Sequence, residues 1–190
     1  SRWNSGFDAT RKSSPRSGPA SAILAGVLLK MGTYGMIRLP FAMMAETFSR
    51  YALAIAILAL VAILYGSLVA LAQSNLKRRI AYTSVNHMGY TVLGIAAAAA
   101  AVGDSLDARQ LALTGATVEM VAHGLITGAL FLMSGSLWQR TNEYELDHYG
   151  GLAQQAPLLT GFMVLGAFAS LGMPGLAGFV LPVLLGNTIG

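Results

Sequence analysis

Four ionisable side chains lie inside apolar stretches of this chain: Lys30, His87, Glu119 and His123. Lys30 stands near the middle of a run of about 20 mostly apolar residues, the length that crosses a bilayer as a helix. A charge at that depth costs roughly 2.5–3.5 kcal/mol on insertion scales, so it normally faces a protein interior or a water-filled path. Lys30 is therefore predicted to be a functional residue that carries protons. The alternative is a static contact with a backbone carbonyl.

Histidine titrates in the physiological pH range, which makes His87 and His123 further candidates for proton transfer. His123 follows Glu119 by four residues, so the two share one face of a helix. Static hydrogen bonds, for example from His87 to Ser84, are the alternative reading. Lys30, His87 and His123 fall on three different apolar segments, which suits a relay of spaced groups linked by water. Hydroxyls that could hold such water are those of Thr114, Thr117, Ser134 and Ser136.

No metal site is predicted. One glutamate and one histidine are a weak ligand set without a third group, and the chain has no cysteine.

The composition is that of a membrane protein. Hydrophobic residues make up 55 % of the 190 and charged residues 11 %, whereas about 25 % is usual for a soluble domain. We therefore expect an all-α membrane protein, a bundle of five transmembrane helices, the last broken at Pro174-Gly175 because proline interrupts a helix. The expected segments are Ser21–Phe41, Tyr51–Gln73, Ile80–Val102, Leu111–Trp138 and a fifth that starts near Pro157.

The polar stretches between these segments predict the topology. Residues 1–20 are expected to be a polar tail, not necessarily native, before a membrane domain over residues 21–190. The link with Lys77, Arg78 and Arg79 should face the cytoplasm by the positive-inside rule, and alternation puts residues 140–155 on the same side. Most basic residues lie in the tail and the links, outside the apolar segments, and form no basic face interleaved with aromatic residues, so nucleic-acid binding is not expected.

Glycines at helical spacing, Gly32 with Gly35 and Gly124 with Gly128, predict close packing between helices.

Four motifs in order resemble the antiporter-like subunit M family of NADH-quinone oxidoreductase, respiratory complex I. Residues 24–38 read LAGVLLKMGTYGMIR and residues 72–89 read AQSNLKRRIAYTSVNHMG. Residues 120–125 read MVAHGL and residues 171–179 read LGMPGLAGF. The resemblance covers about residues 21–180 in one collinear run.

The resemblance implies a proton-pumping helical bundle in which two inverted five-helix repeats each form half a channel, and this chain would hold the second repeat. Lys30 matches the central lysine that links the half-channels. His87 and His123 match histidines that continue the same mid-membrane axis, whereas Lys77 matches a loop position that we interpret as topological.

Three departures from the family pattern stand out. The segment before the lysine helix differs, Pro182 stands where a terminal glutamate is expected, and Glu119 stands where a neutral residue is expected. The sequence at both ends of the chain thus departs from the family pattern, as expected for a truncated reading of the gene. We therefore do not expect this chain alone to move protons across a membrane.

The predicted function is that of a multi-pass, proton-translocating subunit of NADH-quinone oxidoreductase in a bacterial inner membrane. The alternatives are a subunit of a multisubunit Na⁺/H⁺ antiporter or membrane-bound hydrogenase, or a truncated, non-conducting structural segment. The chain shows no catalytic constellation, so its status as an enzyme stays open. No cofactor is expected within it; quinone, NADH, FMN and iron–sulfur clusters are expected in partner subunits. The expected partners are other membrane subunits and the lipid bilayer.

Overall fold

Helices make up nearly all of the computed structural model, which describes residues 17–101 and 106–173. The first apolar segment forms a continuous rod in which α-helical and π-helical turns alternate. These are α1 (Ser17–Ile23), η1 (Leu24–Leu28), α2 (Leu29–Met36) and η2 (Ile37–Phe41), the last containing Pro40. The other helices are α3 (Ala45–Arg50), α4 (Ala52–Leu71), α5 (Leu76–Ala100), α6 (Leu106–Thr141), η3 (Leu146–His148), α7 (Leu152–Gln155) and α8 (Pro157–Ser170).

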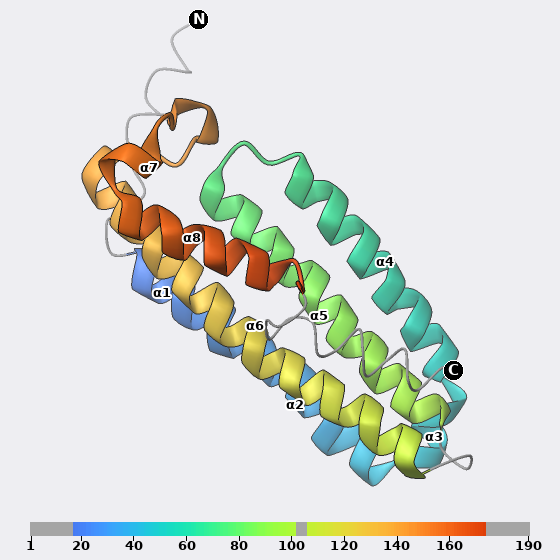
Figure 1. Ribbon diagram of the computed structural model, residues 1–190. Coiled ribbons are helices and arrows are strands. Elements are labelled where there is room, and N and C mark those ends of the chain that lie inside the picture. Colours follow the sequence, from blue (N-terminus) through green and yellow to red (C-terminus); the bar gives the residue numbers. More distant parts are fainter. Residues whose placement is uncertain (1–16, 102–105, 174–190) are drawn as a thin grey trace, which may run out of the picture.

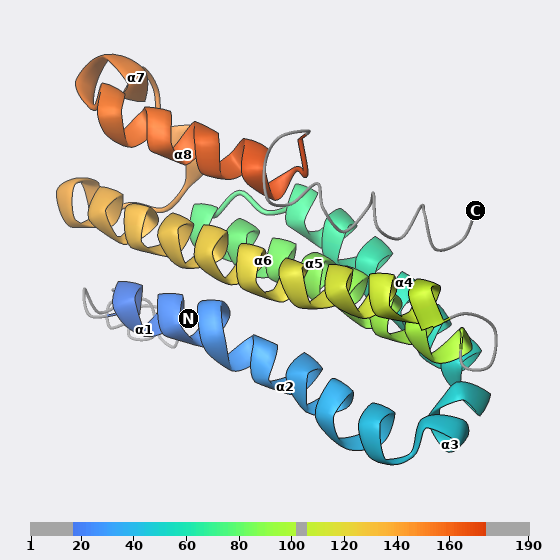
Figure 2. The ribbon, with the colours of Figure 1, turned by 60° about the horizontal axis from the view of Figure 1, so that its bottom comes forward.

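The helix α5 occupies the middle of the bundle, packed between α4 and α6 (Figure 1). The rod from α1 to η2 and the helix α8 both pack on α6, and Figure 2 shows them on different sides of it. This arrangement brings α2, α5, α6 and α8 together around the middle of α6. The predicted site residues lie on three of these helices.

The predicted all-α membrane fold is confirmed: each expected apolar segment contains a helix, and the described residues form no strand. Three helical stretches are long and apolar enough to cross a membrane, namely Ala20–Phe41, Ala52–Leu71 and Leu106–Thr141. The helix α5 is 25 residues long but carries polar groups such as Asn86 and His87, and α8 is a shorter apolar helix. The predicted break at Pro174-Gly175, like most of the predicted tail, lies outside the described residues.

Two apolar clusters enclose a polar layer along the bundle. One cluster joins Phe41 and Phe48 to small residues of α5 and α6, including Ala99 and Ala112. The other joins Ala22 and Ala25 to Ile80, Leu130 and Phe131. His87 on α5 and both Glu119 and His123 on α6 fall between these clusters in sequence. The clusters therefore flank the polar layer along α5 and α6.

Glycines allow the closest helix contacts. A Cβ atom built on Gly66 would lie 2.8 Å from the backbone nitrogen of Asn86, and one built on Gly124 would lie 2.9 Å from the carbonyl oxygen of Gly26. The first contact sets the spacing of α4 and α5, and the second that of η1 and α6. The predicted close packing is thus found at Gly124. It is not found at Gly32 and Gly35, where a Cβ would meet nothing within 4 Å.

The links before α5 and after α6 meet at one end of the bundle, on the same side, as alternation predicts. The backbone nitrogen of Leu76 donates to Tyr144 at 2.9 Å, and that of Leu146 donates to Ser74 at 2.9 Å. The Ser74 hydroxyl donates to the Glu145 carboxylate at 2.7 Å. These bonds tie the two links together. The cytoplasmic side remains a prediction from charge.

Asn75 is expected to contribute to stability as the N-cap of α5. Its side-chain oxygen accepts from the backbone nitrogen of Arg78 at 3.2 Å, and its amide nitrogen lies 3.4 Å from Glu145. We expect Asn75→Ala to lower the free energy of unfolding by about 1 kcal/mol, because a backbone N–H loses its acceptor. Thermal unfolding in detergent measures the loss. Ser136→Ala is the control, since that exposed hydroxyl only bonds the carbonyl of Leu132 on its own helix; an equal loss in both variants would contradict the capping role.

Candidate functional site

Lys30 is a buried cation in the middle of the first apolar rod. It lies on α2 between the two π-helical stretches, and its side chain is 8 % exposed. Its ammonium group donates to the carbonyl oxygen of Ala25, and its Cε atom lies beside Gly124 of α6. Thr33, one turn further along α2, places its hydroxyl 2.9 Å from the sulfur of Met120. Lys30 is thereby held against the stretch of α6 that contains Glu119 and His123.

His87 connects three helices through hydrogen bonds. Its Nδ1 atom lies 2.8 Å from Oε1 of Glu119 on α6, and its Nε2 atom lies 3.2 Å from the hydroxyl oxygen of Ser170 on α8. An ionised carboxylate can only accept; with Glu119 in that form, Nδ1 of His87 carries the proton and Nε2 of the neutral ring accepts from Ser170. Glu119, His87 and Ser170 thus form one hydrogen-bonded chain from α6 through α5 to α8.

His123 stacks on His87. The ring centroids are 4.4 Å apart and the planes meet at 21°. The hydroxyl oxygen of Thr127, one turn along α6, lies 3.0 Å from Nε2 and 3.2 Å from Nδ1 of His123. The proximity of the two histidine rings supports the predicted grouping. Because N–H bonds lie in the plane of an imidazole ring, stacked rings exchange no proton through a direct hydrogen bond.

Burial makes the carboxylate of Glu119 unusual. Glu119 is 3 % exposed and His123 is 2 % exposed. Oε1 of Glu119 is bonded to His87, whereas the buried Oε2 has no hydrogen-bond partner among the described residues. The positive charge of Lys30 interacts electrostatically with this carboxylate. A buried carboxylate oxygen without a donor is costly, so Oε2 stands out as an unsatisfied acceptor at the site.

His87, Glu119 and His123 could also be considered as metal ligands. One donor atom from each lies within 4.8 Å of the others. A tetrahedral zinc ion with bonds of about 2.0–2.2 Å needs donors about 3.4 Å apart and imidazole nitrogens that point at the ion in the ring plane. Two rings stacked face to face do not converge in this way. The geometry therefore favours a hydrogen-bonded cluster, and the absence of a metal site stays a prediction.

The structure places Lys30, His87 and His123 on three different helices, α2, α5 and α6, as predicted. The partner of Glu119 is different: the carboxylate bonds His87 across the helix interface, although its i, i+4 spacing had suggested His123. His87 likewise does not bond Ser84, whose hydroxyl donates to the carbonyl of Ile80 on its own helix.

Three of the four hydroxyls predicted to hold water lie outside the bundle interior. Thr114, Thr117 and Ser136 are exposed on the outer face of α6, and the buried Ser134 donates to the carbonyl oxygen of Phe131. The hydroxyls that do lie at the site are those of Thr33, Thr127 and Ser170. Thr127 could have been found from its spacing of four from His123; no local signal points to Ser170.

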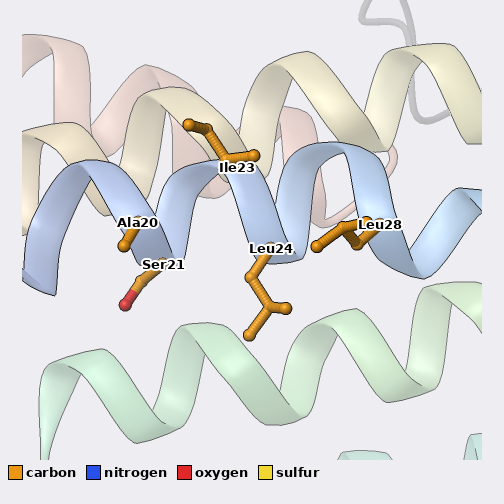
Figure 3. A pocket seen from close by; sticks show the side chains of 5 residues that line it. All are labelled: Ala20, Ser21, Ile23, Leu24 and Leu28. Atoms are coloured by element: carbon orange, nitrogen blue, oxygen red, sulfur yellow. The ribbon is translucent and has the colours of Figure 1, made fainter.

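A shallow apolar groove lies elsewhere, on the outer side of α1 and η1 (Figure 3). It is lined by Ala20, Ser21, Ile23, Leu24 and Leu28. None of these side chains is ionisable, so the groove is not part of the site.

Known proteins resemble almost the whole chain. The family model described as NADH:quinone oxidoreductase/Mrp antiporter, transmembrane, matches residues 12–185. The NAD(P)H-quinone oxidoreductase chain 4 1 of Synechococcus sp. (strain JA-2-3B'a(2-13)) is 44 % identical over 92 % of this chain and 32 % of the relative. The chain 4 1 of Synechococcus sp. (strain JA-3-3Ab) is 46 % identical over 91 % of this chain and 31 % of the relative.

Among solved structures, a chain of respiratory complex I from Thermus thermophilus with bound NADH superimposes with a TM-score of 0.79 at 32 % identity. The match covers 90 % of this chain and 34 % of that one. The chain therefore spans about a third of the length of the relatives it matches.

Proposed function

This chain belongs to the NADH:quinone oxidoreductase/Mrp antiporter membrane family, and we propose that it is the proton-conducting part of an antiporter-like subunit of respiratory complex I. The observation that carries the proposal is the group formed by the buried Lys30, Glu119 and His123 with the partly buried His87 inside a membrane bundle. Intramembrane ionisable residues are rare and mark proton or ion pathways. In the proposed mechanism, Lys30, His87 and His123 pass protons along the middle of the membrane.

The elements around these residues support conduction over static packing. Apolar clusters flank the polar layer on either side along α5 and α6, so the ionisable side chains are concentrated in one layer between them. Lys30 lies between two π-helical stretches, which frequently occur at functional sites in helices. The bond from Lys30 to the carbonyl of Ala25 is the contact that the static alternative predicts, whereas the carboxylate and the two imidazoles in the neighbouring layer supply the groups that conduction requires.

The finer identity is part of the same proposal. The family includes both quinone oxidoreductases and Mrp antiporters, and the relatives named above are NAD(P)H-quinone oxidoreductase chains. We assign the chain to the subunit M or chain 4 type, in the inner membrane of a bacterium, with other membrane subunits as neighbours. The cofactors for NADH oxidation and quinone reduction would lie in those partner subunits, because the chain offers no ligand set for them. A subunit of an Mrp-type antiporter is the alternative.

The test is to purify the membrane complex that contains this chain, identify its subunits by mass spectrometry and measure proton uptake in proteoliposomes. We expect NADH-dehydrogenase and quinone-binding subunits, and NADH-driven proton uptake. Antiporter subunits, with Na⁺-dependent proton exchange instead, would replace the proposal by its alternative. Recovery without any partner and without proton movement would contradict both and favour a non-conducting segment.

A further inference from the structure

We propose that Glu119 is the anionic member of the proton path in this chain: it takes the proton of His87 across the α5–α6 interface, and Ser170 supplies the opposite end of that step. The inference rests on the proposed function and adds two residues to it.

The need for a further group follows from the stacking of the histidine rings. His87 and His123 are close, with ring centroids 4.4 Å apart, but they face each other through their π surfaces. A proton leaves an imidazole along an N–H bond in the ring plane. For Nδ1 of His87, the group in that plane is Oε1 of Glu119 at 2.8 Å. A transfer from His87 therefore goes to the carboxylate before it reaches Lys30 or His123.

The step balances in protons and charge. The step starts from a neutral His87 with its proton on Nδ1, an ionised Glu119, and Ser170 as the group that faces Nε2. A proton that arrives from the Ser170 side protonates Nε2 and gives the imidazolium. The imidazolium then releases the Nδ1 proton to Glu119, which leaves a neutral carboxylic acid and His87 protonated on Nε2. One proton has moved from α8 to α6, and no other co-reactant is needed.

The second oxygen of Glu119 can hold the same proton. The proton arrives on Oε1, and rotation of the protonated carboxyl group moves it to the other side of the group, where Oε2 is buried and has no partner among the residues described. The cation of Lys30 attracts the same carboxylate, without an ion pair within 4.0 Å in the described structure. When Lys30 is positive and Glu119 is negative, the two charges cancel and the buried layer stays close to neutral. A low net charge reduces the cost of burying these groups.

The test is Glu119→Gln in the assembled complex. Glutamine has nearly the same shape and still accepts from Nδ1 of His87, but it cannot take a proton. We expect NADH-driven proton uptake to fall by about tenfold or more, within the range that a positioned proton-transfer group contributes. Glu119→Asp should restore part of the rate, and Ser170→Ala should lower it. Glu46→Gln, an exposed glutamate on α3, is the matched control and should pump normally.

A second measurement separates transfer from packing. In the wild-type complex, ¹⁵N NMR of labelled histidine should show the neutral His87 protonated on Nδ1, and Ser170→Ala should increase the Nε2-protonated form. Full pumping by both Glu119→Gln and Ser170→Ala, or a resting His87 protonated on Nε2, would overturn the inference. If these variants pump normally while a Lys30 variant does not, only the role of Glu119 fails. If the Lys30 variant also pumps, the proposed function itself fails.

Discussion

Replacing Lys30 with alanine is expected to abolish proton translocation by the assembled complex while the chain still inserts into the membrane. Lys30 is buried on α2 beside the layer of Glu119 and His123, and alanine there can neither hold nor pass a proton. Insertion should survive, because the substitution removes a charge that costs roughly 2.5–3.5 kcal/mol at mid-membrane. NADH-driven proton uptake in proteoliposomes, with the amount of chain in the membrane fraction determined in parallel, measures both effects.

Two further variants sharpen this test. Lys30→Arg keeps the positive charge but does not release its proton in proteins, so it should also fail to pump. If both variants fail to pump, a positive charge at this position is not sufficient, and release of the proton is required. Arg78→Ala removes an exposed cation at the start of α5 and should leave pumping unchanged. Proton uptake at the wild-type rate in Lys30→Ala would contradict the proposed mechanism.

Sequence patterns within single segments were sufficient to predict the long apolar helices and the ionisable residues inside them. Apolar runs interrupted by charged links predict helices that cross a membrane, and Lys30 is conspicuous in such a run because nothing nearby neutralises it. Such signals are local: they depend on residues within a few turns. They predicted the long apolar helices to within a few residues, except that α6 runs from Leu106 to Thr141, several residues beyond the predicted Leu111–Trp138. The short helices α3, η3 and α7 were not predicted.

Contacts between helices could not be predicted from patterns within one segment. The bond from His87 to Glu119 joins residues 32 apart, and that from His87 to Ser170 joins residues 83 apart. Which hydroxyls reach the site depends on the face of the helix on which they lie. On α6 the buried face runs through Ala112, Ala116, Glu119, His123 and Thr127, at intervals of three or four. The predicted Thr114 and Thr117 fall off this face, and attention to the helical period would have excluded them.

The spacing of α4 and α5 should be the most sensitive packing feature. A Cβ on Gly66 would lie 2.8 Å from the backbone nitrogen of Asn86 and 3.2 Å from its Cα, so Gly66→Ala cannot be accommodated by a side-chain rotation. One helix must move away from the other. Overpacking of this kind costs typically about 1–3 kcal/mol, which should appear as a lower melting temperature of the purified complex.

Gly35→Ala is the matched control for this prediction. A Cβ at Gly35 of α2 meets nothing within 4 Å, and alanine is the better helix former, so stability should be unchanged or slightly higher. An equal melting temperature for Gly66→Ala and Gly35→Ala would show that α4 and α5 are not held at this distance.

The effect of Gly66→Ala should also extend to transport, because Asn86 directly precedes His87 on α5. A shift of that backbone would lengthen the 2.8 Å bond to Glu119 and lower the rate of proton uptake, although no ionisable group has been changed.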